Sequence, residues 1–147
     1  MGTSIRQYIS ADQKAAQSVV LRGFKDFCFE YSPQYDFDLD DPKKHYIEKG
    51  GMFYILEIND KIVGTIAVIK KGNIAELKRW YVDKEFQGKG YGSKLLDKAI
   101  LFCKKNKVNK IEFETNKKFL KAHLLYEKRG FKVVREDDRS FYMEKEL

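Results

Sequence analysis

The chain has 147 residues, of which 43% are hydrophobic, 14% aromatic and 35% charged, and its formal net charge is +7. This composition is too apolar and too aromatic for a disordered chain, and too charged for a membrane protein. A chain of this length buries about two-thirds of its unfolded surface on folding, so we expect one compact domain over residues 1–147.

The positive charge is concentrated in the second half of the sequence. Residues 1–73 carry 10 basic and 10 acidic side chains, whereas residues 74–147 carry 19 and 12. A positive field there suits a phosphorylated small molecule, and it equally suits nucleic acid. A lysine-rich surface that only contacts solvent explains the same count, so charge alone does not choose between these interpretations.

The start of the chain has no recognisable targeting signal. Residues 1–10 lack the apolar run of a signal peptide, and Arg6 stands where an N-myristoylation signal needs Ser or Thr. No stretch approaches the length of a transmembrane helix. Both cysteines, Cys28 and Cys103, lie in apolar helical patterns and are predicted to be buried free thiols. We therefore expect a cytoplasmic protein.

The first half begins with a strand and a long helix. Residues 5–9 fit a short strand, and apolar residues at helical spacing predict an amphipathic helix over 11–31, ended by Pro33. A loop that is both acidic and aromatic follows, and then a short helix that stops before Gly50. Three strands separated by short turn sequences predict an antiparallel meander at residues 52–58, 61–69 and 74–82.

The second half alternates helices with strands. A helix is predicted after Gly92, followed by a strand, a helix and two strands at residues 111–115, 119–129, 131–135 and 140–145. The order predicts a mixed α/β (α+β) domain, in which one central mixed sheet of about seven strands is flanked by about four helices.

The most specific motif is the turn at residues 87–93, which reads QGKGYGS and joins a strand to a helix. Such a turn directs backbone N–H groups and the positive end of the helix dipole toward one point, where a pyrophosphate would fit. A dinucleotide fingerprint would need a third glycine at Ser93, and the Walker A spacing does not occur. The pattern Q-x-x-G-x-G fits without exception, although a glycine-rich turn can also simply reverse the chain.

From Ile74 to Phe131 the chain resembles the GNAT superfamily of acetyl-CoA-dependent acyltransferases. The strand AELKRWYV, the loop DKEFQGKGYGSKLL, the strand KIEFETN and the helix AHLLYEKRGF occur in the family's order. The resemblance implies two parallel strands that splay apart to admit a cofactor arm. It also implies that acetyl-CoA is the cosubstrate and that an amine receives the acetyl group directly in a ternary complex. Residues 1–73 agree with the family in layout only.

The same resemblance implies roles for individual residues. The backbone of Trp80, Tyr81 and Val82 would pair with the pantetheine arm as with an added strand, and the N–H of Val82 would stabilise the oxyanion. Asn116 matches a position that contacts the cofactor arm, and Tyr126 matches the tyrosine beside the thioester sulfur. The pyrophosphate would be held by the backbone of Gln87, Gly88, Lys89, Gly90, Tyr91, Gly92 and Ser93.

Two side chains are candidates for proton transfer. Tyr126, with an unperturbed pKa of about 10, stays protonated at neutral pH and can donate to a departing thiolate. Glu76, on the strand that leads to the cofactor site, is the candidate general base, acting on the amine through water. Each has an alternative interpretation, because helix tyrosines usually pack at the core boundary and Glu76 could pair with Lys78 or with an arginine across the sheet.

The sequence does not identify the amine. An acidic and aromatic loop suggests a cationic acceptor or is only solvated; its residues are Tyr35, Asp36, Phe37, Asp38, Asp40 and Asp41. The alternative functions are a non-catalytic acyl-CoA-binding module, which would not need Tyr126 or Glu76, and a nucleic-acid-binding face of lysines within residues 104–121, which ranks last. His45 and His123 lack ligands at metal spacing, so no metal is expected. We expect neither a nucleic acid nor a membrane as partner, and an exposed strand edge is compatible with a homodimer.

Overall fold

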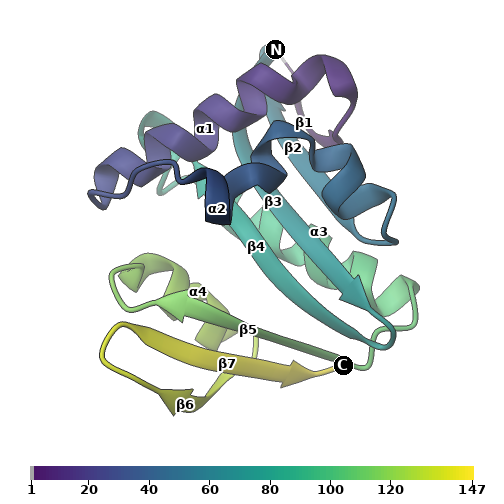
Figure 1. Ribbon diagram of the computed structural model, residues 1–147, viewed down its shortest axis with the longest axis vertical. Coiled ribbons are helices and arrows are strands. Elements are labelled where there is room, and N and C mark those ends of the chain that lie inside the picture. Colours follow the sequence, from purple (N-terminus) through teal and green to yellow (C-terminus); the bar gives the residue numbers. More distant parts are fainter. Residues whose placement is uncertain (1) are drawn as a thin grey trace.

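Seven strands form one mixed sheet. The computed structural model describes residues 2–147. The strands are β1 (Thr3–Gln7), β2 (Met52–Ile58), β3 (Lys61–Lys71), β4 (Ile74–Val82), β5 (Lys110–Asn116), β6 (Lys132–Glu136) and β7 (Ser140–Glu146). Their order in the sheet is β1-β2-β3-β4-β5-β7-β6 (Figure 1), and every neighbouring pair is antiparallel except β4 and β5. The predicted mixed sheet with an antiparallel N-terminal meander is confirmed.

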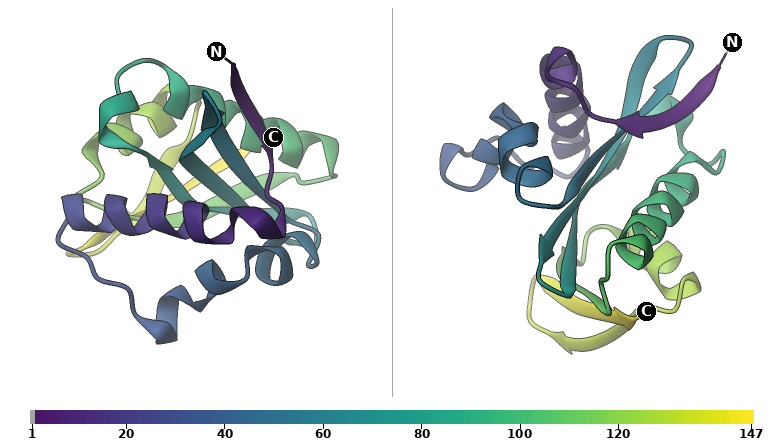
Figure 2. Two further views of the ribbon diagram at one scale, coloured as in Figure 1. Left: turned by 90° about the horizontal axis from the view of Figure 1, so that it is seen from above. Right: turned by 90° about the vertical axis from the view of Figure 1, so that its right-hand side faces the viewer.

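Helices cover the two faces of the sheet unequally. One face carries α1 (Gln13–Asp26), α2 (Pro33–Asp36), and short helical turns at Phe37–Asp40 and Lys43–Ile47, all near β2 to β4. The opposite face carries α3 (Tyr91–Lys105) and α4 (Leu120–Lys128), as the right-hand view of Figure 2 shows. Because α1 and α2 extend no further than β4, the same face of β5, β7 and β6 has no helix over it (Figure 1).

The apolar core follows this division. The larger part lies between the sheet and the helices α3 and α4, and includes Leu95, Leu96 and Ile111, none of which is exposed to solvent. A smaller cluster under α1 contains Val20, Phe24 and Leu39, with Tyr81 of β4 packed against it. The sheet is therefore buried on both faces at β3 and β4, which fixes these two central strands most firmly.

A bulge in β4 changes the face that its side chains occupy. Two residues, Arg79 and Trp80, lie opposite the single residue Ile66 of β3. Arg79 has φ 57°, a left-handed conformation that is unfavourable for a residue with a Cβ. Because of the extra residue, Trp80 points into the core under α3, whereas Tyr81 points under α1. Strict alternation along β4 would have placed these two side chains the other way round.

The parallel strands β4 and β5 separate soon after they meet. They pair only at Ile74 with Lys110 and at Ala75 with Ile111. Beyond Ala75 the remaining residues of β4 have no strand partner on the β5 side, so the backbone groups on that edge are free. The predicted splay of the two parallel strands is confirmed.

The first helix is shorter than predicted, and the prediction that Cys28 is buried was wrong. α1 ends at Asp26 because Cys28 adopts φ 61° and the N–H of Phe29 donates to the carbonyl of Phe24 at 2.8 Å. This closure of the last turn ends a helix without a proline. Cys28 occupies the left-handed position after the helix and is exposed, whereas Cys103 is buried as predicted.

Candidate active site

The glycine-rich turn forms an open cradle at the start of α3. Gly88 has φ 76° and Gly90, which caps the helix, has φ 88°. A Cβ built on either glycine would meet no atom within 4 Å, so the space around both is open. The first turn of a helix leaves N–H groups without intrahelical partners, and the dipole makes that end positive. These residues therefore suit a pyrophosphate.

Side chains fasten this turn to β4. The indole N–H of Trp80 donates to the carbonyl oxygen of Gly92 at 3.1 Å, and the side-chain amide of Gln87 donates to the carbonyl oxygen of Val82 at 2.8 Å. Sequence reasoning assigned roles only to the backbone of Trp80. The bulge explains why its side chain matters, because without the bulge the indole would not point toward α3.

Tyr126 lies in an aromatic cluster beside the splayed strands. Its ring centroid is 5.0 Å from that of Trp80, 4.6 Å from that of Phe113 and 5.5 Å from that of Phe131. The residue is only 5% exposed, and burial raises the pKa of its hydroxyl well above the usual value. Within residues 2–147 the hydroxyl has no hydrogen-bond partner, so it is a protonated donor that is not used by the fold.

Glu76 faces a cavity on the side of the sheet opposite α4. The cavity has a volume of about 370 Å³ and lies between β4 and the β5–β7–β6 half of the sheet. Four of its lining residues are glutamates, namely Glu76, Glu112, Glu114 and Glu144. Lys110 pairs with Glu112 and Glu144, and the hydroxyl of Ser140 donates to Glu114. Glu76 has no ion-pair or hydrogen-bond partner within the described part of the chain, so the suggested pair with Lys78 is not formed.

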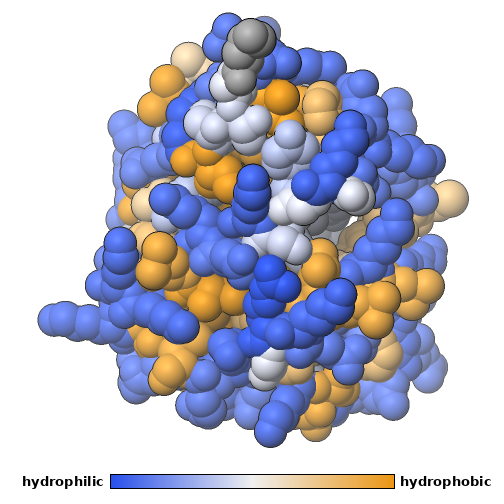
Figure 3. Space-filling view, turned by 180° about the vertical axis from the view of Figure 1, so that it is seen from behind, coloured by the Kyte–Doolittle hydropathy of each residue, from blue (hydrophilic) through white to orange (hydrophobic). Residues whose placement is uncertain are grey.

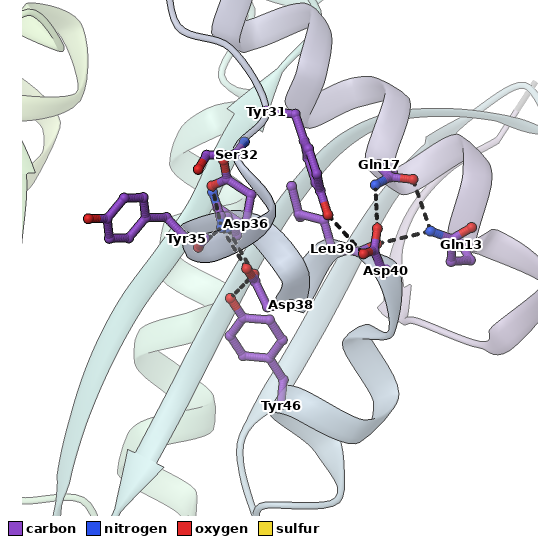
Figure 4. Close-up of polar contacts among 11 residues, drawn as sticks. Gln13, Gln17, Tyr31, Ser32, Tyr35, Asp36, Asp38, Leu39, Asp40 and Tyr46 are labelled. Atoms are coloured by element: carbon purple, nitrogen blue, oxygen red, sulfur yellow. Dashed lines mark hydrogen bonds and ion pairs between the residues drawn. The ribbon is translucent and has the colours of Figure 1, made fainter.

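The acidic loop is used for internal contacts. Figure 4 shows its carboxylates directed at neighbouring side chains and backbone. Asp36 and Asp38 both bind Arg79 of β4, at 3.0 and 2.6 Å. Asp40 accepts hydrogen bonds from Gln17 and from the hydroxyl of Tyr31. These carboxylates are occupied, so the loop is a structural clamp on β4, whereas the carboxylate of Glu76 has no partner within residues 2–147.

The turn, the bulged strand and Tyr126 all lie within one recognised stretch of sequence. A model of the acetyltransferase (GNAT) family matches residues 20–131. The chain belongs to the acetyltransferase (GNAT) family. Its resemblance to GNAT proteins from Ile74 to Phe131 is thereby confirmed, and the match extends well into the first half of the chain. Membership of this family places the chain among the acyltransferases.

Sequence relatives of this GNAT chain include N-acetylaspartate synthetases. The one from Xenopus tropicalis is 33% identical over 100 residues, which is 66% of this chain and 37% of that protein. The one from Danio rerio is 31% identical over 104 residues, covering 69% and 37%. An uncharacterized N-acetyltransferase of Methanocaldococcus jannaschii is 33% identical over 86 residues, 54% of this chain and 38% of that protein. The matched stretch is thus well under half of each relative.

Solved GNAT structures share the whole fold. An acetyltransferase of the GNAT family from Staphylococcus aureus superposes with a TM-score of 0.90 at 27% identity, covering 99% of both chains. The PaiA N-acetyltransferase of Thermoplasma acidophilum, solved in complex with coenzyme A, superposes with a TM-score of 0.82 at 23% identity, covering 100% of both chains. The second likeness shows the fold alone.

Three lysines of the stretch predicted as an alternative nucleic-acid-binding face have contacts within the protein. Lys110 pairs with two glutamates, Lys117 pairs with Glu136, and Lys118 lies 5.3 Å from the ring of Phe29. The face that carries α3 and α4 mixes polar side chains with several separate apolar areas (Figure 3). Residues 2–147 contain no group of three or more His, Cys, Asp or Glu side chains placed so that they could hold a metal ion. None of the helices in these residues is both long and apolar enough to cross a membrane.

Two predicted residues have local contacts of their own. The side-chain oxygen of Asn116 accepts from the N–H of Lys118 at 2.9 Å, which shapes the turn into α4. His123, one turn before Tyr126, binds Glu127 at 3.1 Å, and its other ring nitrogen is buried without a partner within residues 2–147. Contact of Asn116 with a cofactor arm stays a prediction.

Proposed function

We propose that this GNAT chain is an N-acetyltransferase that passes the acetyl group of acetyl-CoA to a primary amine by direct attack in a ternary complex. The observation that carries the proposal is the arrangement around the splay. The open turn before α3, the free edge of β4 and the unpartnered hydroxyl of Tyr126 are joined through one side chain, Trp80.

The residues of the splay suit the cofactor. Gln87, Gly88, Lys89, Gly90, Tyr91, Gly92 and Ser93 would hold the pyrophosphate, and the free edge of Trp80, Tyr81 and Val82 would pair with the pantetheine arm. When bound, acetyl-CoA supplies the activated acetyl group as a thioester. The N–H of Asp83 donates to the carbonyl of Val63 on β3 at 2.8 Å. Because successive N–H groups of a strand alternate in direction, the N–H of Val82 points away from β3 into the splay, where it can stabilise an oxyanion.

Proton transfer is assigned to two side chains on opposite sides of the sheet. Tyr126 reaches the splay from the side of α4 and, with its raised pKa, remains a proton donor for the leaving thiolate. Glu76 projects from β4 into the acidic cavity on the other side. A carboxylate without a partner there can accept the proton of an ammonium group through water.

The charge of this cavity favours a cationic acceptor over a dicarboxylate one. Its lining includes four glutamates and the basic residues Lys71 and Arg135, and Lys110 pairs with two of the glutamates. Four acidic groups therefore face three basic ones, and the excess negative charge lies at the unpaired Glu76. Negative side chains attract an alkylammonium group and repel carboxylates. We therefore propose that polyamines or lysine side chains are better acceptors for this chain than aspartate.

Calorimetric titration with acetyl-CoA, followed by thiol release in the presence of amines, tests the proposed function. Desulfo-CoA and ATP serve as the binding controls, and the amines are spermidine, a lysine peptide, an amino sugar and aspartate. We expect acetyl-CoA to bind and one cationic amine to release thiol. Binding without release from any amine would favour the non-catalytic acyl-CoA-binding module. Absence of binding would refute the proposed function.

A further inference from the structure

Arg79 of β4 is a buried arginine that belongs neither to the glycine-rich turn nor to the proton-transfer groups. Its side chain is only 9% exposed. It makes a two-pronged contact with Asp38, with Nε at 2.9 Å from one oxygen and a terminal nitrogen bound to the other, and a further bond to Asp36 at 3.0 Å. The hydroxyl of Tyr46 donates to Asp38 at 2.6 Å. This network joins β4 to the segment 33–47.

The same residue creates the bulge that orients the cofactor strand. Arg79 has φ 57°, and its carbonyl oxygen accepts a hydrogen bond from the hydroxyl of Thr65 at 2.7 Å. It directly precedes Trp80, Tyr81 and Val82, whose free edge is the proposed binding strand for the pantetheine arm. Arg79 is therefore part of the cofactor strand through its backbone and is bound to the segment 33–47 through its side chain.

The charges of the network favour a fixed geometry. Burial alone would raise the pKa of the Asp38 carboxyl, but hydrogen bonds and charge from Arg79, with a contribution from Tyr46, hold that pKa below its usual value. An arginine fork bound at both carboxylate oxygens fixes direction as well as distance. A restraint on the backbone position of Arg79 therefore also restrains the positions of Asp36 and Asp38.

We propose that Arg79 is a positioning residue that couples occupation of the cofactor strand to the order of segment 33–47, which lies on the same face of the sheet as the Glu76 cavity. The inference rests on the proposed function. Pairing of the cofactor arm with β4 restrains the backbone beside Arg79, and the arginine fork transmits that restraint to the clamp formed by Asp36 and Asp38. Binding of the cofactor thus orders a segment on the face of the sheet where the acceptor is proposed to bind.

Hydrogen–deuterium exchange with and without coenzyme A tests this coupling. In the unmodified chain, coenzyme A should slow amide exchange at least about fivefold both in residues 87–93 and in residues 33–47, because both lose local opening. In Arg79→Lys, which keeps the charge but not the fork, slowing should persist in residues 87–93 and fall below about twofold in residues 33–47.

A second arginine provides the matched control. Arg6 of β1 donates two hydrogen bonds to Asp12, at 2.8 and 3.0 Å, and a third to Glu57 at 3.3 Å. Its strand, β1, lies at the edge of the sheet, separated from β4 by β2 and β3. Arg6→Lys should lower thermal stability yet keep the response of both segments. If Arg79→Lys fails to fold, Asp36→Asn, which removes the charge of one carboxylate bound to Arg79 and leaves Asp38 in place, should weaken the response of residues 33–47.

The outcomes separate the inference from the proposed function. An equal response of residues 33–47 in the unmodified chain and in the Arg79 or Asp36 variant would overturn the coupling and leave acetyl transfer intact. The same holds if coenzyme A protects residues 87–93 but never residues 33–47. If coenzyme A protects neither segment of the unmodified chain, the proposed function and the inference both fail.

Discussion

Replacement of Tyr126 by phenylalanine separates catalysis from stability at this site. Phenylalanine keeps the ring contacts with Trp80, Phe113 and Phe131 and removes only the hydroxyl, which has no hydrogen-bond partner within residues 2–147. Because the hydroxyl makes no hydrogen bond that its removal would break, the free energy of unfolding should change by less than about 1 kcal/mol. Loss of a general acid should lower kcat by a factor of about 10² to 10⁴, equivalent to roughly 2.7 to 5.4 kcal/mol of activation free energy.

The assay compares Tyr126→Phe with Tyr54→Phe. Tyr54 is also buried, at 8% exposure, but belongs to β2 and is not part of the splay. Urea unfolding gives the stability of both variants, calorimetry gives their affinity for acetyl-CoA, and thiol release gives kcat. We expect only Tyr126→Phe to lose turnover, with cofactor affinity nearly unchanged. A variant with full turnover would refute the role of Tyr126 as proton donor, and a loss of several kcal/mol in stability would show that the hydroxyl serves the fold.

Three further predictions follow from the geometry. Gly90→Val should weaken acetyl-CoA binding at least about 100-fold, or about 3 kcal/mol, in a calorimetric titration; Gly50→Val, whose glycine shares φ 88° and has the same empty surroundings, should leave binding intact. Gly23→Ala would place a Cβ in steric conflict with the ring of Tyr81, and overpacking of this kind should cost about 1 to 3 kcal/mol in urea unfolding. Gly2→Ala, with no atom within 4 Å, should cost nothing measurable. The pKa of Asp38 is lowered in the folded state, so its contribution to stability is present above the unfolded pKa of about 4 and is lost as pH falls below that value. Asp38→Asn should therefore flatten the dependence of the unfolding free energy on pH below about 4. The same pH dependence in the variant and in the unmodified chain would contradict this assignment.

Most of the fold could be predicted because turn residues and hydrophobic period agree along the chain. The strands Met52–Ile58 and Ile74–Val82 begin and end where the sequence predicted. The end of α1 could not be predicted, because it depends on Cys28 adopting a left-handed conformation that is rare for residues other than glycine. The usual stop signal, Pro33, lay further along the chain and misplaced the boundary.

The site was predicted by motif more than by physical pattern. The glycine turn and Tyr126 carry local signals, but a bulge has none, because it is defined only by the register of two strands. Arg79 therefore read as an ordinary strand residue, and the carboxylates that it binds read as a free acidic loop. Pairing of Asp36 and Asp38 with Arg79 spans more than 40 positions of sequence, which no periodicity reveals.

The pairing between β4 and β5 is so short that the chain could be divided between these two strands. Only two residue pairs join the two halves of the sheet as strands, while each half is completed by antiparallel neighbours of its own. A cut in the turn after α3, near Lys107, would break no strand pairing at all. The piece from residue 110 onward is too small to bury a core alone, so it would fold only on the longer piece. The protein is thus suited to reassembly from two separately produced fragments, with recovery of the splay as the measure of success.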